Sequence, residues 1–191
     1  MISPAACERP AASGDPVSGP DENGTDGDDH PSASSRWRRM RLMTGGFLAY
    51  RRARFASRFP TDRLYTPGHF WLGRQDTGLW RVGLTKFALR MLGEPVEIDF
   101  EVEPGASVEV GSVVGWLEGF KAVTDLIAPL SGCFHGGNPA LVDAVEVVKT
   151  DPYGAGWLYL TGGEPGQECR DAPGYAAWLD ETIDRMTGTT S

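Results

Sequence analysis

The sequence predicts a mainly β protein with a few short helices. After residue 60 the apolar residues come in short runs that glycine and proline separate, a pattern typical of an all-β sandwich or small barrel. One run is especially clear. Val96, Ile98 and Phe100 alternate with acidic residues, which is the period of a half-buried strand.

Two strands and a helix are predicted ahead of that strand. Short strands are expected over residues 70–73 and 79–83, on either side of a turn. Thr85 can cap a helix, and Gly93 can end it two residues before a proline that prevents its continuation.

A second helix is predicted near the C-terminus. Tyr175, Leu179, Ile183 and Met186 follow one another at intervals of three or four residues, and Trp178 widens the apolar stripe that they form. We expect this stripe to pack on the sheets.

Composition divides the chain into three parts. Residues 1–45 are rich in Pro, Ser, Gly, Asp and Ala and nearly lack large apolar side chains, so we interpret them as a disordered tail. Residues 46–60 are expected to form a basic linker or arm, and residues 61–191 one globular domain. The arginines of the arm could indicate a membrane-surface or RNA-binding segment, but a solvated linker, or an arm lying on the acidic domain, is the simpler interpretation.

The expected globular domain is strongly acidic. From Thr61 onward, 19 acidic side chains outnumber 9 basic ones. Such a surface argues against nucleic acid as a partner, because phosphates favour the opposite sign. It suits docking to basic partner surfaces, although a merely soluble acidic protein has the same composition.

The cysteines indicate neither a disulfide framework nor a metal site. Cys7, Cys133 and Cys169 are odd in number and lack CxxC spacing. Cys133 and His135 could share one face of a strand, but two side chains are too few to hold a metal.

No apolar run is long enough for a membrane span. We therefore expect a cytoplasmic protein with no membrane partner.

Lys121 is the candidate functional residue. Apolar runs over residues 113–117 and 126–129 predict two strands, with the lysine at the tip of the hairpin between them. Lys86 and Lys149 are the only other lysines in the chain. A lysine at a turn is usually just solvated, but a hairpin tip also suits a lysine that carries a covalent modification.

The residues around Lys121 resemble the lipoyl-bearing core of the glycine cleavage H-protein family. The matching positions before the lysine are Gly105, Val108, Glu109, Gly111, Gly115 and Glu118, and those after it are Ala122, Val123, Asp125, Pro129, Ser131, Gly132, Asn138, Ala140, Leu141, Asp151, Pro152, Tyr153, Gly154, Gly156 and Trp157. The resemblance extends over residues 62–160. It implies the barrel-sandwich hybrid fold of lipoyl and biotinyl carriers, with short helices and a C-terminal helix.

The resemblance also implies a function without catalysis. Lipoate would be attached covalently to Lys121, and the protein would carry an aminomethyl group from the glycine decarboxylase to the aminomethyltransferase. Dihydrolipoamide dehydrogenase and a lipoylating enzyme would be the other partners of a protein expected to be a monomer. No set of nucleophile, base and orienting acid can be assembled from the three histidines of the chain.

Four further site residues follow from the resemblance. Asp125 would receive the charged amine, and Glu118 would guide the lipoylating enzyme, unless it is only a solvated charge at a strand end. The family usually has a Ser-His-Glu-Trp segment, where this chain has Gly68, His69, Phe70 and Trp71. Phe70 would therefore face the cargo without the family's carboxylate.

Two alternatives remain open. Biotin is the nearest rival modification, but biotinyl hairpins favour methionine on both sides of the lysine, where this chain has Phe120 and Ala122. The missing polar residues near His69 favour the second alternative, an H-like lipoate-binding carrier for another cargo, in sulfur oxidation or as a lipoyl relay.

Overall fold

The computed structural model describes residues 45–188. In chain order its elements are β1 (Phe47–Arg52), β2 (Phe55–Pro60), β3 (Leu64–Tyr65), β4 (Phe70–Arg74), β5 (Trp80–Leu84), α2 (Lys86–Leu92), β6 (Pro95–Phe100), β7 (Ser107–Val108), β8 (Val113–Gly119), β9 (Ala122–Ile127), β10 (Leu130–Gly137), the 3-10 turn η1 (Pro139–Leu141), α3 (Val147–Thr150), β11 (Tyr159–Pro165) and α4 (Ala172–Thr187). Strands predominate, as the sequence predicts.

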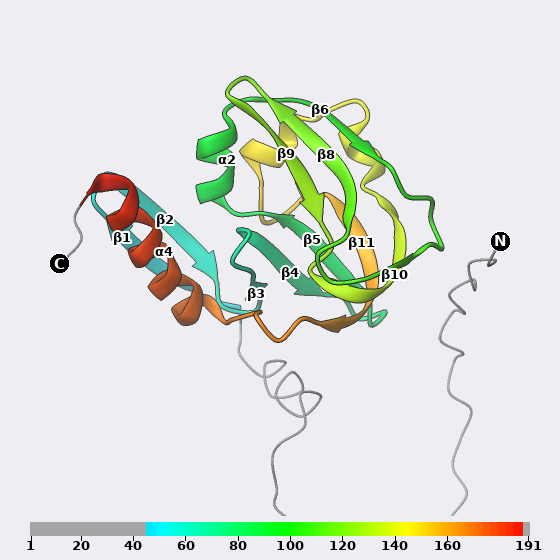
Figure 1. The fold of residues 1–191 in the computed structure, drawn as a ribbon, viewed down its shortest axis with the longest axis horizontal. Coiled ribbons are helices and arrows are strands. Elements are labelled where there is room, and N and C mark those ends of the chain that lie inside the picture. The colour runs from blue at the N-terminus through cyan, green and yellow to red at the C-terminus, as the bar shows by residue number, and fades with distance from the viewer. Residues whose placement is uncertain (1–44, 189–191) are drawn as a thin grey trace, which may run out of the picture.

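The strands form three antiparallel sheets. A six-stranded sheet has the order β3-β4-β5-β11-β10-β7, a three-stranded sheet has the order β6-β8-β9, and β1 pairs with β2 alone. The two larger sheets make up the main body in Figure 1, and the β1–β2 hairpin lies beside that body together with α4.

The main core lies between the two larger sheets. Val82 and Phe134 from the six-stranded sheet, Leu117 and Leu126 from the three-stranded sheet, and Leu89 from α2 are all buried in one cluster. Two sheets packed in this way make a barrel-sandwich hybrid, which confirms the fold implied by the resemblance.

Helix α2 has the ends that the sequence predicts. The Thr85 Oγ1 accepts a hydrogen bond from the Ala88 N–H at 3.4 Å, and the Gly93 N–H donates to the carbonyl of Leu89 at 3.0 Å. Gly93 has a φ of +90°, a conformation that favours glycine because it has no Cβ. Both ends of this short helix are therefore fixed by local chemistry.

A hairpin and a helix form a second core. The segment 46–60, where the sequence suggests a basic linker or arm, contains the β1–β2 hairpin. Its Phe59 is fully buried and packs edge-on against Tyr175 of α4, with ring centroids 5.1 Å apart. The Tyr50 hydroxyl donates to Asp180 at 2.9 Å, and the Arg52 Nε donates to Asp184 at 3.0 Å. The hairpin is thus tied to α4 by packing and by charge.

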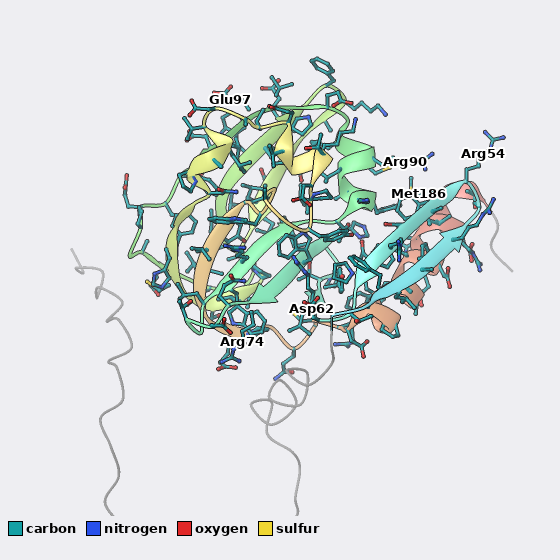
Figure 2. The ribbon with its side chains drawn as sticks, turned by 180° about the vertical axis from the view of Figure 1, so that it is seen from behind. Arg54, Asp62, Arg74, Arg90, Glu97 and Met186 are labelled. Atoms are coloured by element: carbon teal, nitrogen blue, oxygen red, sulfur yellow. The ribbon has the colours of Figure 1, made fainter. Side chains whose placement is uncertain are left out.

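The apolar stripe of α4 differs partly from the prediction. Tyr175, Leu179 and Ile183 are buried, but they lie in the cluster with the hairpin side chains rather than in the main core between the sheets. Met186, next to the last residue of α4, is 56% exposed. Figure 2 shows Met186 near the hairpin turn that bears Arg54.

A hydrogen-bonded network joins the start of α2 to α4. The Tyr175 hydroxyl lies 3.0 Å from the His69 Nδ1 and 2.9 Å from the Thr85 Oγ1, and the Thr85 N–H donates to the His69 carbonyl at 2.9 Å. His69 has a φ of +64°, which is uncommon outside glycine. Burial lowers the pKa of His69 from 6.5 to about 4, so the imidazole is neutral at pH 7.

We predict that His69 makes stability depend on pH in mild acid. The folded state opposes protonation of His69 and the unfolded state does not, so the unfolding free energy should fall as the pH drops from 6.5 towards 4. The contribution of this one group is at most about 1.4 kcal/mol per pH unit. Denaturant unfolding at pH 6.5 and pH 5 would measure it.

The matched variant is His69→Asn, which retains a hydrogen-bonding side chain, tolerates a positive φ and does not titrate. Its unfolding free energy should change less between pH 6.5 and pH 5 than that of the parent. Equal slopes for the two proteins would contradict the prediction.

Candidate functional site

Lys121 lies at the tip of a tight β-hairpin. Strands β8 and β9 pair along their length, and Gly119 faces Ala122 across the last pair of the register. Phe120 and Lys121 form the turn, where both are exposed, Phe120 by 81%. The position of Lys121 at the hairpin tip agrees with the sequence prediction.

The hairpin tip is docked on the end of α2. The Lys121 N–H donates to the carbonyl of Leu92, and the Phe120 N–H donates to the carbonyl of Glu94, both at 3.0 Å. A Cβ on Gly119 would lie only 2.6 Å from the Leu92 carbonyl oxygen, so this approach requires glycine. The backbone of the lysine is therefore held, while its side chain extends into solvent.

Gly93, between Leu92 and Glu94, also lies against the lysine. A Cβ at this position would lie 3.1 Å from the Cγ and 3.4 Å from the backbone nitrogen of Lys121. The glycine thus ends α2 and also leaves room for the stem of the lysine.

Glu118 and Asp125 lie on the outer face of the three-stranded sheet. Asp125 pairs with Trp116, which pairs in turn with Asp99, and side chains that pair in this way share a face. Glu118 is two residues from Trp116 on β8 and so points to the same side, whereas Leu117 between them is buried in the core. The predicted acids therefore share the outer, acidic face, which Glu97 joins at the upper edge of the sheet in Figure 2.

An open cavity of about 290 Å³ lies beside Lys121, and four of the five residues that bound it are basic, with the aliphatic parts of their side chains forming much of its surface. It is bounded by Lys86, Leu89, Arg90, Lys121 and Lys149. All three lysines of the chain line this cavity. Lys149 forms an ion pair with Glu94. Glu118 and Asp125 are not among the lining residues. The acidic face and the basic cavity are therefore two separate surfaces near Lys121.

His69 and Phe70 are not among the residues that line this cavity. His69 belongs to the network with Tyr175 and packs against the ring of Phe87, with centroids 4.7 Å apart. Phe70 is only 4% exposed and lies in the main core, in the same cluster as Leu84 and Leu89. Phe70 therefore packs among apolar side chains in this structure, and its contact with the cargo, which the resemblance implies, stays a prediction. A glutamate there would bury a carboxylate among apolar side chains.

Other candidate chemistry is not assembled in residues 45–188. Cys133 is buried and His135 is exposed, and no group of three or more potential ligands that could hold a metal occurs in this range. The same residues contain no helix that is both long and apolar enough to cross a membrane.

Four residues around the cavity and the docked tip escaped sequence reasoning. Lys86, Arg90 and Lys149 line the cavity, and Glu94 partly neutralises it. The sequence offers one signal for the lysines, which is their rarity: only three of the 18 basic residues are lysine. That signal does not show that α2, α3 and the hairpin meet.

Comparison with known proteins agrees with this architecture. The family model described as "Glycine cleavage H-protein" matches residues 63–165. Glycine cleavage system H proteins of Synechococcus sp. strain RCC307 and Beutenbergia cavernae are 38% and 40% identical over 125 and 118 residues. These matches span 64% and 62% of this chain and 95% and 94% of the relatives.

A solved structure shows the same relationship. The crystal structure of a glycine cleavage system H protein from Mycobacterium marinum matches with a TM-score of 0.58 and 39% identity, over 63% of this chain and 98% of that chain. The matched regions contain the hairpin, Lys121 and the helix on which the hairpin tip is docked. The chain therefore belongs to the glycine cleavage H-protein family, whose members carry lipoate.

Proposed function

We propose that the protein is lipoylated on Lys121 and serves as the mobile carrier of a glycine cleavage system. The observation that carries the proposal is the exposed lysine at the tip of a hairpin whose backbone is fixed on α2. A carrier needs an accessible amine for modification and a fixed base for a flexible arm. It needs no catalytic residue of its own, so we propose a carrier without enzymatic activity.

The surroundings of Lys121 fit a lipoyl group. The side chain is exposed, and the small residue Ala122 follows it on the hairpin. When attached, the dithiolane would supply a disulfide that accepts a group reductively; loss of the group leaves a dithiol, and reoxidation restores the disulfide. The protein holds the attachment point through the Lys121 and Phe120 amides.

We further propose that the cargo is an aminomethyl group in transit from the glycine decarboxylase to the aminomethyltransferase, with reoxidation by dihydrolipoamide dehydrogenase in the cytoplasm. The acidic outer face supports this cargo, because Asp125 is four residues after the lysine and can attract a charged amine. Glu118 is the side chain that we propose guides the lipoylating enzyme. No nucleic acid or membrane partner is proposed.

A second candidate is an H-like lipoate-binding carrier for another cargo, in sulfur oxidation or as a lipoyl relay. The basic cavity favours it, because Lys86 and Arg90 would repel an amine and attract an acidic group. Gene neighbourhood separates the two: decarboxylase and aminomethyltransferase genes support the first, and redox sulfur genes support the second.

Lipoylation should occur on Lys121 alone. The protein made with an active lipoylation pathway should gain one lipoyl group, because only this lysine lies at a docked hairpin tip. Intact mass and peptide mapping would locate it, with Lys86 and Lys149 as internal controls. Modification of either control with Lys121 left bare would refute the proposal.

Substitution of Gly93 by alanine should disturb both stability and lipoylation. Gly78 is the matched control, because its φ of +85° is close to the +90° of Gly93 but a Cβ there meets no atom within 4 Å. Gly78→Ala should cost only backbone strain, about 1 to 2 kcal/mol. Gly93→Ala should cost more, because a φ of +90° with a ψ of −148° is essentially confined to glycine and because its Cβ crowds Lys121, and it should slow lipoylation.

Denaturant unfolding and the rate of mass gain with a lipoylating enzyme would measure these two effects. If both variants lose the same stability and lipoylate at the same rate, the contact between Gly93 and the lysine has no bearing on how the amine is presented.

Asp125→Ala should shorten the lifetime of the aminomethyl-loaded protein. The carboxylate is exposed, so we expect an effect of up to about fivefold, equivalent to about 1 kcal/mol. Release of formaldehyde and ammonia after loading by the decarboxylase would measure it. Asp99→Ala is the control, because Asp99 lies on the same face but two strands away. Equal release from both variants would show that Asp125 has no specific role.

A further inference from the structure

We infer that the basic cavity beside Lys121 is a binding site for a small oxyanion, of the carboxylate, sulfonate or sulfate class. The inference goes beyond the proposed function, because the site exists before Lys121 is modified. Its first support is composition: the chain has a net charge of −8 and only three lysines, yet all three line one cavity together with Arg90.

The four basic side chains reach the cavity from three separate elements. Lys86 and Arg90 are four residues apart on α2 and so lie on the same face of the helix, Lys149 lies in α3, and Lys121 lies at the hairpin tip. Like charges brought together repel one another. An anion between them would relieve this repulsion.

The charge in the cavity is only partly balanced from within. Glu94 forms an ion pair with Lys149 and is the acid that the structure places on a cavity side chain among residues 45–188. Acylation of Lys121 would remove one positive charge. Lys86, Arg90 and Lys149 would then face one carboxylate, so the cavity stays positive in the modified protein.

Arg90 is held against the β1–β2 hairpin. Its Nη1 donates to the Arg54 carbonyl at 3.2 Å, and its guanidinium lies 5.9 Å from the centroid of the Phe55 ring. Figure 2 shows Arg90 on the side of α2 that faces the hairpin turn with Arg54. The buried Leu89 forms an apolar part of the lining. A guanidinium fixed in this way loses little freedom when it binds an oxyanion.

The lining selects the ligand class. Guanidinium and ammonium groups donate charge-assisted hydrogen bonds to oxyanions, whereas a protonated amine would find no acceptor among the basic side chains. A volume of about 290 Å³ suits a small molecule or the end of a flexible arm. The oxyanion could therefore be free in solution or be carried on the lipoyl arm.

Titration with sulfate, followed by amide NMR shifts, tests the site. Sodium sulfate should cause saturable shifts at Gly93, Glu94 and Lys121 in the unmodified and the lipoylated protein, and sodium chloride at equal ionic strength should not. Identical shifts with both salts, or saturable shifts only at a distant surface, would overturn the inference. Sulfate binding by the unmodified protein would stand even if mass analysis showed no lipoylation, so the two proposals fail separately.

Charge variants should move the affinity in opposite directions. Lys86→Gln and Arg90→Gln should each weaken sulfate binding by about fivefold, and Glu94→Gln should tighten it to a similar extent because it frees Lys149. Arg74→Gln is the control, since Figure 2 shows Arg74 at the other end of the main body, and it should change nothing. These side chains are exposed, and the dispersion of the spectrum reports whether each variant is folded.

The sulfate affinities of these variants show whether sulfate binds in the cavity. Equal weakening by Arg74→Gln, or no tightening by Glu94→Gln, would show that sulfate responds to the general charge of the protein and not to this cavity.

Alkylation of the reduced lipoyl arm identifies the source of the oxyanion. In a Cys7→Ser background, a lipoyl thiolate displaces iodide from iodoacetate to give an anionic carboxymethyl thioether, or from iodoacetamide to give a neutral one of similar size. Cys133 and Cys169 are buried. If only the anionic adduct shifts the cavity amides, the arm delivers the oxyanion; if neither does while sulfate binds, the ligand is a free oxyanion. Equal shifts from both adducts would show that the arm docks there without regard to its charge and would overturn the inference.

Discussion

The contact between the tip of the β8–β9 hairpin and the end of α2 fixes the position of the lysine. Two backbone hydrogen bonds, from Lys121 to Leu92 and from Phe120 to Glu94, close the gap between a strand turn and a helix terminus. The first of them also satisfies the Leu92 carbonyl, which the end of the helix leaves without an intrahelical partner. Gly119 permits the approach because any larger residue would collide with the Leu92 carbonyl. The presentation of the amine therefore depends on backbone geometry more than on the lysine side chain.

The other end of α2 is fixed by a different kind of chemistry. Thr85 caps the helix and also meets the Tyr175 hydroxyl, which the ring of His69, the residue before β4, contacts as well. Tyr175 is itself packed against Phe59 of the N-terminal hairpin and stacked on Tyr65, with centroids 5.1 and 4.8 Å apart. The β1–β2 hairpin and α4 thus support a helix on whose far end the tip with Lys121 is docked. The second core, between the β1–β2 hairpin and α4, therefore helps to hold the site in place.

The elements that could be predicted from the sequence are those that local rules determine. Thr85 and Gly93 mark both ends of α2 through capping and a positive φ, and neither needs a distant partner. The strands in the segment 47–60 could not be predicted in this way. Its arginines suggest a linker, and its hydrogen-bond partners Asp180 and Asp184 are in α4, far away in the sequence. Its strand pairing depends on tertiary contacts that no local pattern shows.

The candidate site also has a part that the sequence predicts and a part that depends on the tertiary structure. Lys121 could be found from turns and apolar runs, but the charges around it depend on where strands and helices meet. The pleat of β8 and β9 sends Glu118 and Asp125 to the outer face, while α2 and α3 bring Lys86 and Lys149 to the cavity. A single lysine thus stands between an acidic face and a basic cavity. An arm attached there would rest on the side opposite in charge to the group that it carries, so the cargo determines where the arm docks.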